Sequence, residues 1–306
     1  MTNKNIKLGI ILAVLIALAW AYQGPFQDWK ENRGKPKNFL GKIKVEEVDK
    51  IEVTKGGATT VLEKQNERWR IRGTKDFYVK DSVSSFIISV LETAVKAKIE
   101  LAGENQEKKS EFMTDEAGGI GLKLYQGEIL AADFIIGKNT PDYVGSYISK
   151  KDLDKTYLIK AGLSSAFNQS EWRDDTIFAG DKEKISKIRF QYPSREFTIE
   201  KAGDKWQGTL PYKFEVDEEK INKVSDIMSS LRAAKIPEQD FSKTGLDKHL
   251  IIVEATGGEI SNTLMIGDVF AEDENLYYVK KGNSDNIYLI SKEERDGLDK
   301  TIRDLR

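Results

Sequence analysis

The only histidine of the 306-residue sequence, His249, is the first candidate for catalysis, because a nucleophilic triad needs a histidine as its general base. His249 stands in LDKHLIIVE at the start of a predicted strand, where a lone polar residue is usually solvated. Cysteine is absent, so thiolate nucleophiles, cysteine-based zinc sites and disulfides are excluded. We therefore expect no catalytic role for His249.

Two further stretches could bind a phosphate or a cation. Residues 118–123, GGIGLK, lack the G-x-x-x-x-G-K-[ST] spacing of a phosphate loop and lead into a strand, whereas a phosphate site needs a helix N-terminus. The acidic run at residues 272–274, with Asp268 nearby, offers oxygen ligands for a hard cation. It lacks the glycine and alternating acids of a calcium loop, and its counterpart at residues 138–142 is not acidic. We predict a turn and a solvated hairpin loop.

The charge balance limits the possible functions further. Lysine plus arginine number 48 and aspartate plus glutamate number 50, so no global field recruits nucleic acid. Among the 50 acids, no pair stands out by its spacing as a general acid and base. The sequence therefore predicts no catalytic, cofactor-binding or metal-binding residue, no cofactor, and a protein that is not an enzyme.

The N-terminal segment predicts attachment to a membrane. Residues 8–27 are uncharged and, if helical throughout, span ~30 Å, about one hydrocarbon core. The strongly apolar part runs from Leu8 to Tyr22, and aromatic residues around its end would lie at the interface. A cleaved secretory signal and a buried core helix are the alternatives. We favour an uncleaved anchor over residues 1–30, because aromatic residues crowd the small-x-small cleavage sites.

The orientation of this anchor rests on the size of the domain that follows. Two lysines precede the apolar segment and four basic residues follow it closely, so the charge count does not place the N-terminus inside. Long domains translocate largely regardless of charge. We expect a single-pass protein of the inner (cytoplasmic) membrane, with the bulk of the chain outside the cytoplasm and a membrane protein as its partner.

The rest of the chain is a tandem repeat. When the sequence is slid along itself, Trp69 aligns with Trp206, and Gly137 aligns with Gly267 at a slightly smaller offset. The period is domain-sized, so two similar domains are expected and not a solenoid. We predict a linker at residues 31–44, repeat domains at 45–163 and 185–306, and a second linker at 164–184.

Each copy contains short strands, one amphipathic helix and further strands. Apolar residues recur at three- and four-residue spacing from Val83 to Val95 and from Ile221 to Leu231, which predicts one helix per copy. The flanking stretches alternate and are bounded by turn residues, which predicts antiparallel strands. The predicted fold class is α+β: two tandem similar domains, each an antiparallel sheet packed on one helix, preceded by a transmembrane helix.

The paired tryptophans Trp69 and Trp206 are the clearest landmarks of the repeat, together with Gly137 and Gly267. Each tryptophan follows a turn-like pair, in NERWRI and in GDKWQG. They could be aromatic platforms for a ligand at two equivalent sites. We favour core tryptophans that begin the return strand of a hairpin, because a duplicated packing unit keeps its core aromatics.

These features together resemble an uncharacterised bacterial domain family, known only as a domain of unknown function. They include the anchor, the strand-turn-Trp unit, a Phe-x-Val before each helix and an Ile-Gly before a Tyr-containing hairpin. The resemblance covers the layout of residues 1–300 and includes the linker SEWRD at 170–174. A Thr-Gly-Leu at 244–246 is replaced by EFMTDEAGG in the first copy. The resemblance implies a membrane-anchored protein encoded beside ABC-transporter components of the gliding-motility or auxiliary type.

Three functions follow from these observations. We expect a membrane-anchored, non-enzymatic accessory or adaptor protein of an ABC-transport or cell-envelope complex. The alternative is an extracytoplasmic module that binds a ligand, such as a glycan or peptide, in the cleft between the two repeats. A hydrolase that uses carboxylates is third, and a convergent pair of buried acids would favour it.

Overall fold

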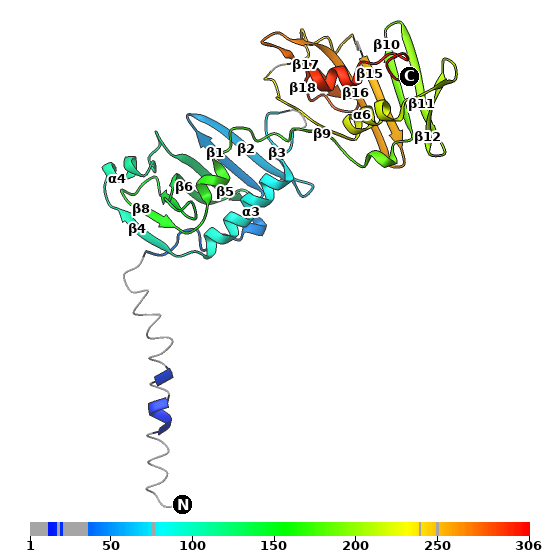
Figure 1. Cartoon of the computed structure of the whole chain (residues 1–306). Coiled ribbons are helices and arrows are strands. Elements are labelled where there is room, and N and C mark those ends of the chain that lie inside the picture. The colour runs from blue at the N-terminus through cyan, green and yellow to red at the C-terminus, as the bar shows by residue number, and fades with distance from the viewer. Residues whose placement is uncertain (1–11, 17–18, 21–35, 75–76, 239, 249–250) are drawn as a thin grey trace, which may run out of the picture. The chain divides into compact units, whose positions relative to one another are not determined.

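The computed structural model describes residues 12–16, 19–20, 36–74, 77–238, 240–248 and 251–306 (Figure 1). His249 lies outside the described residues, as does most of the predicted anchor at residues 1–30. In the described part of the chain, no helix has the length and apolar character that a membrane span requires.

The chain divides into two compact units. The first comprises residues 1–63 and 82–170, and the second comprises residues 64–81 and 171–306. Residues 64–81 therefore belong to the first copy by sequence and to the second unit by their contacts. The repeat boundaries expected at 45–163 and 185–306 remain a prediction.

The first sheet has eight strands in the order β3-β2-β1-β5-β6-β7-β8-β4. Its strands are β1 Lys50–Lys55, β2 Ala58–Gln65, β3 Arg68–Ile71, β4 Ile99–Gly103, β5 Ile120–Gln126, β6 Ile129–Asn139, β7 Ser146–Ser149 and β8 Thr156–Ile159. From β2 to β4, neighbouring strands pair antiparallel.

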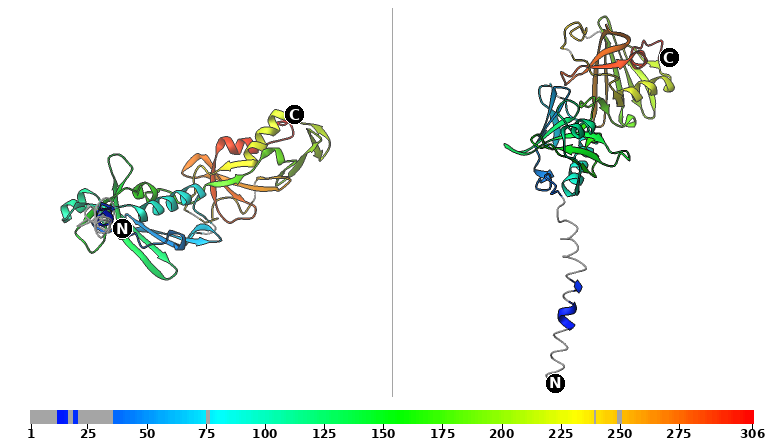
Figure 2. Two further views of the ribbon diagram at one scale, coloured as in Figure 1. Left: turned by 90° about the horizontal axis from the view of Figure 1, so that it is seen from below. Right: turned by 90° about the vertical axis from the view of Figure 1, so that its left-hand side faces the viewer.

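The second sheet also has eight strands, in the order β13-β12-β11-β10-β15-β16-β17-β18. Its strands are coloured from green to orange-red in Figures 1 and 2. They are β10 Lys187–Tyr192, β11 Arg195–Ala202, β12 Lys205–Leu210, β13 Phe214–Glu215, β15 Ile251–Gly257, β16 Ile260–Phe270, β17 Asp273–Lys281 and β18 Tyr288–Ser291. All neighbours pair antiparallel. A separate small sheet pairs β9 Thr176–Ala179 with β14 Ser230–Arg232.

The two large sheets share the order of seven strands and differ at their edges, because β4 ends the first sheet beyond β8 and β13 ends the second beyond β12. Their orders coincide when β1 to β3 are matched with β10 to β12, and β5 to β8 with β15 to β18. A 3-10 turn precedes each first strand, η1 at Val45–Glu47 and η2 at Lys182–Lys184, with the same offset that relates the two tryptophans. The two-part α+β plan expected from the sequence is therefore present.

Five helices of the described residues accompany the sheets: α3 Asp81–Lys96, α4 Gln106–Glu111, α5 Leu163–Phe167, α6 Glu218–Ser229 and α7 Lys292–Leu298. The apolar stripes of the two longest are buried, at Ile87, Val90, Leu91 and Ala94 in α3 and at Ile221, Val224 and Met228 in α6. Asp217 caps α6, because its carboxylate accepts the amides of residues 219 and 220.

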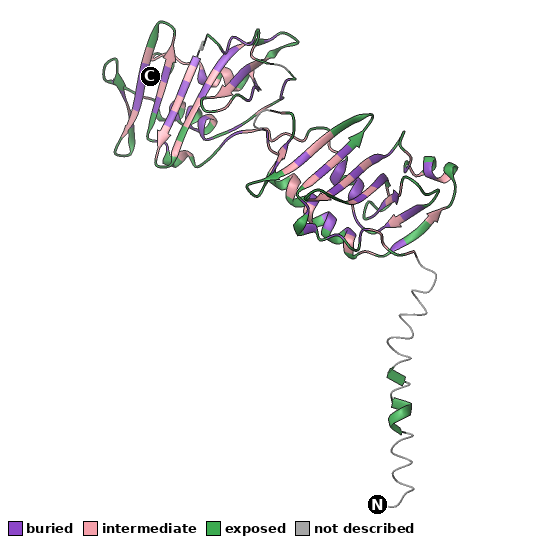
Figure 3. Ribbon diagram, turned by 180° about the vertical axis from the view of Figure 1, so that it is seen from behind, coloured by how far each residue is buried: buried purple, intermediate pink, exposed green. Residues whose placement is uncertain are grey.

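The core follows the alternation of the strands. In β15, Ile251, Val253 and Ala255 are buried and the residues between them are half-buried, so purple and pink bands alternate along the strands in Figure 3. A side-chain period of two places every second residue on one face of a sheet. One face of β15 therefore supplies the core, whereas β6, β11 and β18 bury three or more consecutive residues.

Candidate functional site

The two paired tryptophans lie in equivalent hairpins. Trp69 is 6 % exposed and Trp206 is 5 % exposed, which agrees with the core interpretation. The turn before Trp69 has positive φ at Asn66 (49°) and Glu67 (64°), and the turn before Trp206 has positive φ at Gly203 (66°). Such turns match the twist of a two-residue hairpin. Neither tryptophan offers an exposed aromatic platform.

The two stretches that could bind phosphate or cations adopt ordinary turns. The amide of Gly118 donates to the carboxylate of Asp115 at 2.8 Å, and β5 begins shortly afterwards at Ile120. Residues 272–274 lie in the β16–β17 hairpin and are exposed. Among the described residues, no three acids or histidines are grouped as metal ligands would be.

The landmark glycines occupy the same irregular position in β6 and β16. The pairing register shifts directly after Ile136 and after Ile266. A Cβ on Gly137 would overlap the carbonyl oxygen of Phe112, and a Cβ on Gly267 would overlap that of Thr244. The residue after each glycine donates its amide to the same oxygen, at 3.0 Å in the first unit and 2.7 Å in the second. A chain segment crosses each bulged strand at this point, residues 112–114 in the first unit and residues 244–246 in the second. Because glycine has no Cβ, it lets this crossing segment approach the strand closely.

The crossing segments are therefore equivalent, although their sequences differ. Phe112, Met113 and Thr114 take the place of the Thr-Gly-Leu at residues 244–246. The middle residue of both is left-handed, with φ 56° at Met113 and 71° at Gly245. Glycine adopts this conformation freely, whereas another residue loses about 1 kcal/mol or more. The first copy thus keeps a methionine where glycine is the unstrained choice.

The interior next to this crossing differs between the copies. In the second unit, Leu246, Phe270 and Ile287 belong to a buried hydrophobic cluster with Tyr278 and Leu289. The matched backbone of the crossing segments places Thr114 at the position of Leu246, and the alignment of the repeats places Thr140 and Thr156 at the positions of Phe270 and Ile287. The hydroxyls of Thr114 and Thr156 lie 2.8 Å apart and are buried. Three large apolar residues are thus replaced by small polar ones.

A groove of about 790 Å³ opens at this place in the first unit. Its lining includes Phe112, Met113, Tyr143 and Tyr147, together with Lys55 and Lys138. The rings of Phe112 and Tyr147 stack with centroids 4.1 Å apart. Small-molecule and cofactor sites commonly have volumes of about 300 to 1,000 Å³, so this groove is large enough to bind a ligand.

The charges around the groove are unevenly paired. The carboxylate of Glu111 binds Lys108 at 2.5 Å, and this interaction lowers the pKa of Glu111. Lys138 lies 5.4 Å from the centre of the Phe112 ring, and Lys55 donates to the neutral amide oxygen of Asn168 at 2.5 Å. Within the described part of the chain, no carboxylate lies at ion-pair distance from Lys55 or Lys138. The groove therefore presents positive charge beside aromatic rings.

The equivalent of Lys55 in the second unit is held by the C-terminal segment. The repeat alignment that matches the tryptophans places Tyr192 at the position of Lys55. The hydroxyl of Tyr192 donates to the carbonyl of Lys300 at 2.6 Å and accepts the amide of Lys300 at 2.8 Å. Burial, with a smaller effect of Asp299, raises the pKa of Tyr192 to about 12. The strand end that carries a lysine beside the groove in one copy thus anchors the C-terminal segment in the other.

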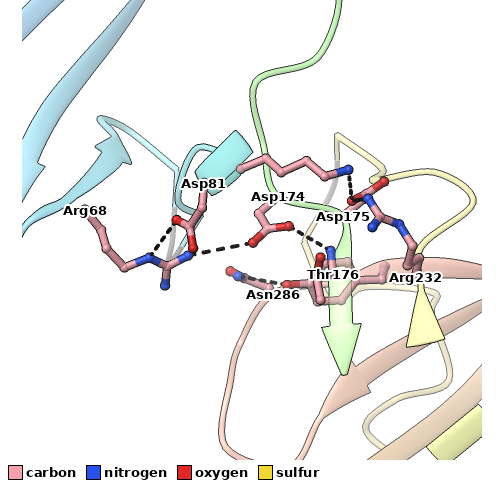
Figure 4. A network of polar contacts seen from close by, with 9 residues as sticks. Arg68, Asp81, Asp174, Asp175, Thr176, Arg232 and Asn286 are labelled. Carbon is pink, nitrogen blue, oxygen red and sulfur yellow. Dashed lines mark hydrogen bonds and ion pairs between the residues drawn. The ribbon is translucent and has the colours of Figure 1, made fainter. Parts of the chain in front are cut away.

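A second candidate site is a charged cluster in the second unit (Figure 4). Asp174 accepts the amide of Thr176 at 3.0 Å and lies 3.7 Å from the guanidinium of Arg68. Asp175 binds Arg232 at 2.5 Å and Lys80 at 3.3 Å. Burial raises the pKa of Asp175, and the carboxylate of Asp174 acts in the same direction. Asp174 and Asp175 are adjacent carboxylates, and the sequence alone did not distinguish them from the other acids as a candidate pair.

The cavity beside this cluster is small, about 210 Å³, and its polar groups contact one another. Arg173 binds Glu171 at 2.6 Å and Glu238 at 2.7 Å, and the buried amide of Asn286 donates to the hydroxyl of Tyr288 at 3.3 Å. Because cations and backbone amides already occupy these acids, we assign the cluster to holding chain segments together. The groove of the first unit is the better candidate site.

The fold is that of a tandem α+β protein. The chain belongs to the family described as domain of unknown function DUF4340, whose profile matches residues 80–238 and 206–306. No curated protein and no solved structure matches the chain.

Sequence reasoning did not find the groove. Thr140 of its lining stands where the second copy has phenylalanine, and the buried Thr156 stands where the second copy has isoleucine, so part of the difference is readable from the repeat. The match of Thr114 with Leu246 could not be read from the sequence, because residues 112–114 resemble residues 244–246 in backbone conformation and not in residue type. A comparison of buried positions between the copies would have shown the loss of apolar volume.

Proposed function

We propose that this protein is a membrane-anchored, non-enzymatic accessory or adaptor protein of an ABC-transport or cell-envelope complex, with both sheets outside the cytoplasm. The groove of the first unit is the observation that carries this proposal. An open surface that combines apolar side chains with lysines suits the binding of a partner. In this role each copy is a rigid module, in which the amphipathic helix covers one face of its sheet.

The described parts of the N-terminal segment support anchoring. Residues 12–16 and 19–20 are helical, and their side chains are exposed. Ile16 is 61 % exposed and Trp20 is 72 % exposed. Exposing such side chains to water is unfavourable, whereas lipid accommodates the aliphatic ones and tryptophan favours the interface. We therefore propose insertion of the segment from residue 8 to residue 22 into the inner membrane.

Membrane fractionation tests the anchor. The full chain should stay with the membranes through high-salt and alkaline washes, and a variant with Leu15→Arg and Ile16→Arg should be released, because two buried arginines oppose insertion. Protease added to cells without an outer membrane should digest the bulk of the chain. Release of the unaltered chain by salt alone would contradict anchoring.

Chemical cross-linking in intact membranes tests the partner. After gentle detergent extraction, the full chain should be recovered with a membrane-embedded transport or envelope component. The matched control is the Leu15→Arg/Ile16→Arg variant, which should lose the partner because it leaves the membrane. Recovery of no membrane partner from the unaltered chain would count against the adaptor role.

A second candidate function is an extracytoplasmic ligand-binding module. The sequence placed such a site between the copies, whereas the groove of about 790 Å³ lies inside the first unit. Native mass spectrometry of the chain purified from cells tests this function. A small molecule that co-purifies, and is lost on Tyr143→Gly, would favour it over the adaptor role.

A further inference from the structure

We propose that the groove of the first unit binds an acidic peptide segment that carries an aromatic side chain. This inference rests on the adaptor role, and it names the chemistry of the partner. Four properties of the groove carry it: two strained exposed residues, an aromatic stack, two lysines without carboxylate partners among the described residues, and the contrast with the filled interior of the second copy.

Two large residues of the groove are held in the left-handed conformation. φ is 56° at Met113 and 59° at Tyr143, and their side chains are 45 % and 75 % exposed. The fold gains little from side chains that remain in water, yet the backbone is strained at both positions. At the equivalent of Met113, the second copy has Gly245, which adopts φ 71° without strain. The side chains of Met113 and Tyr143 are therefore kept for a contact outside the fold.

The lining favours an aromatic group. Met113 offers a polarisable thioether beside the stacked rings of Phe112 and Tyr147, and Tyr143 adds a further exposed ring. Thioethers and aromatic rings make favourable contacts with an incoming ring, and their flat surfaces accept it without a deep pocket. An aromatic side chain of the partner can thus replace water over this part of the groove.

The lysines favour negative charge next to that ring. Lys108 binds Glu111 directly and lowers the pKa of its carboxylate, and Lys138 adds to this effect only from a greater distance. Lys55 donates to a neutral amide, that of Asn168. Both Lys55 and Lys138 can therefore bind a carboxylate without first breaking an ion pair.

A peptide supplies both features within neighbouring residues. Free anions would leave the aromatic and thioether surface in water, and a lipid chain would have to lie against the polar amides of Asn139 and Asn168. A segment with glutamate or aspartate beside tryptophan, phenylalanine or tyrosine satisfies the whole lining. Peptide recognition of this type uses side-chain pockets for specificity.

Selection from a displayed library of random short peptides tests this inference on the full chain in detergent. Peptides with acids beside an aromatic residue should be enriched. The enrichment should disappear on a chain with Met113→Gly and Tyr143→Gly, which relaxes the backbone and removes the two left-handed side chains of the groove. Lys243→Gly is the matched control, because Lys243 is also left-handed (φ 60°) and exposed but lies in the second unit. It should keep the enrichment.

The best selected peptide should then be titrated by fluorescence anisotropy. We expect Met113→Gly and Tyr143→Gly together to weaken its binding by roughly tenfold or more, and Lys55→Gln or Lys138→Gln by about threefold to fivefold each, with less effect at high salt. Circular dichroism melting checks that the variants fold.

Enrichment of basic or unbiased sequences, enrichment that survives in the double glycine variant, or binding of anionic phospholipid vesicles in place of peptides would each overturn the inference. The outcome is separable from that of the proposed function. Peptide selection does not require membrane anchoring, and the fractionation and cross-linking experiments do not require the groove to be the contact surface.

Discussion

The filled cluster of the second unit and the groove of the first unit occupy equivalent places in two copies of one fold. Leu246, Phe270 and Ile287 pack together in one copy, whereas threonines stand at the same positions in the other. The second copy therefore shows what this fold needs for its own stability. Where the first copy has a different residue at an equivalent position, above all at Met113, stability alone does not explain the choice.

The close approach of the crossing segment to the bulged strand should require glycine in both copies. Replacing either glycine is expected to cause the largest loss of stability. Gly137→Ala and Gly267→Ala should each lower the free energy of unfolding by about 3 kcal/mol or more, because the new Cβ overlaps a backbone carbonyl that cannot move far. Denaturant titration measures both. Gly162→Ala is the control, because among the described residues, apart from its two chain neighbours, no atom lies within 4 Å of its added Cβ.

A small effect at only one of the two glycines would break the comparison. It would mean that one crossing segment moves away from its strand without loss. The match between residues 112–114 and residues 244–246 would then hold for the backbone geometry but not for the energetics of the two copies.

Exchange of core residues between the copies tests the interior next. Leu246→Thr should lower the free energy of unfolding by about 2 to 3 kcal/mol, because it removes buried apolar volume and adds a hydroxyl. Thr114→Val should cost about 1 to 2 kcal/mol, because the hydroxyl of Thr156 loses its partner. The double variant Thr114→Val/Thr156→Val should cost less than the sum of the two single changes. Additive costs would show that the two hydroxyls are not coupled.

Much of the fold was predictable from the sequence, because the repeat preserves core residues. The match of Trp69 with Trp206 aligned two hairpins that the structure places at equivalent positions. The strand order was not predictable, since it depends on pairings between residues far apart in the chain. The assignment of residues 64–81 to the second unit also has no local signal, because those residues continue the pattern of the first copy.

The candidate site was less predictable than the fold. Residues 118–123 were tested only as a phosphate loop, yet Gly118 lines the groove. Met113 gave no signal, because its importance lies in a positive φ that a methionine does not predict. Exposed aromatic residues such as Tyr143 are also common on protein surfaces. Tyr143 is distinguished from them only by its place beside the other residues of the groove.

The third test concerns Tyr192, which stands at the position of Lys55, and it uses the dependence of stability on pH. The pKa of Tyr192 is raised to about 12 in the folded state, so its contribution is fully present below pH about 10, the unfolded value, and is lost as the pH rises through 12. After allowance for partial exposure, about 1 to 2 kcal/mol should be lost over this range. Tyr192→Phe should flatten this part of the stability profile, measured by denaturant titration at each pH. Equal profiles would show that the hydroxyl does not anchor Lys300.

The smallest expected change in stability is that of Met113→Gly. It is also the most informative, because it separates a role of this side chain in stability from a role in binding. Met113→Gly should leave the free energy of unfolding unchanged or raise it by up to about 1 kcal/mol, since relief of the left-handed strain offsets the greater entropy of glycine in the unfolded chain. Lys243→Gly should behave alike, because Lys243 is also left-handed and exposed. Denaturant titration of both variants decides the point. If Met113→Gly costs about 1 kcal/mol or more while Lys243→Gly costs nothing, the methionine is part of the core, and the first copy needs it for the reason that the second needs Leu246.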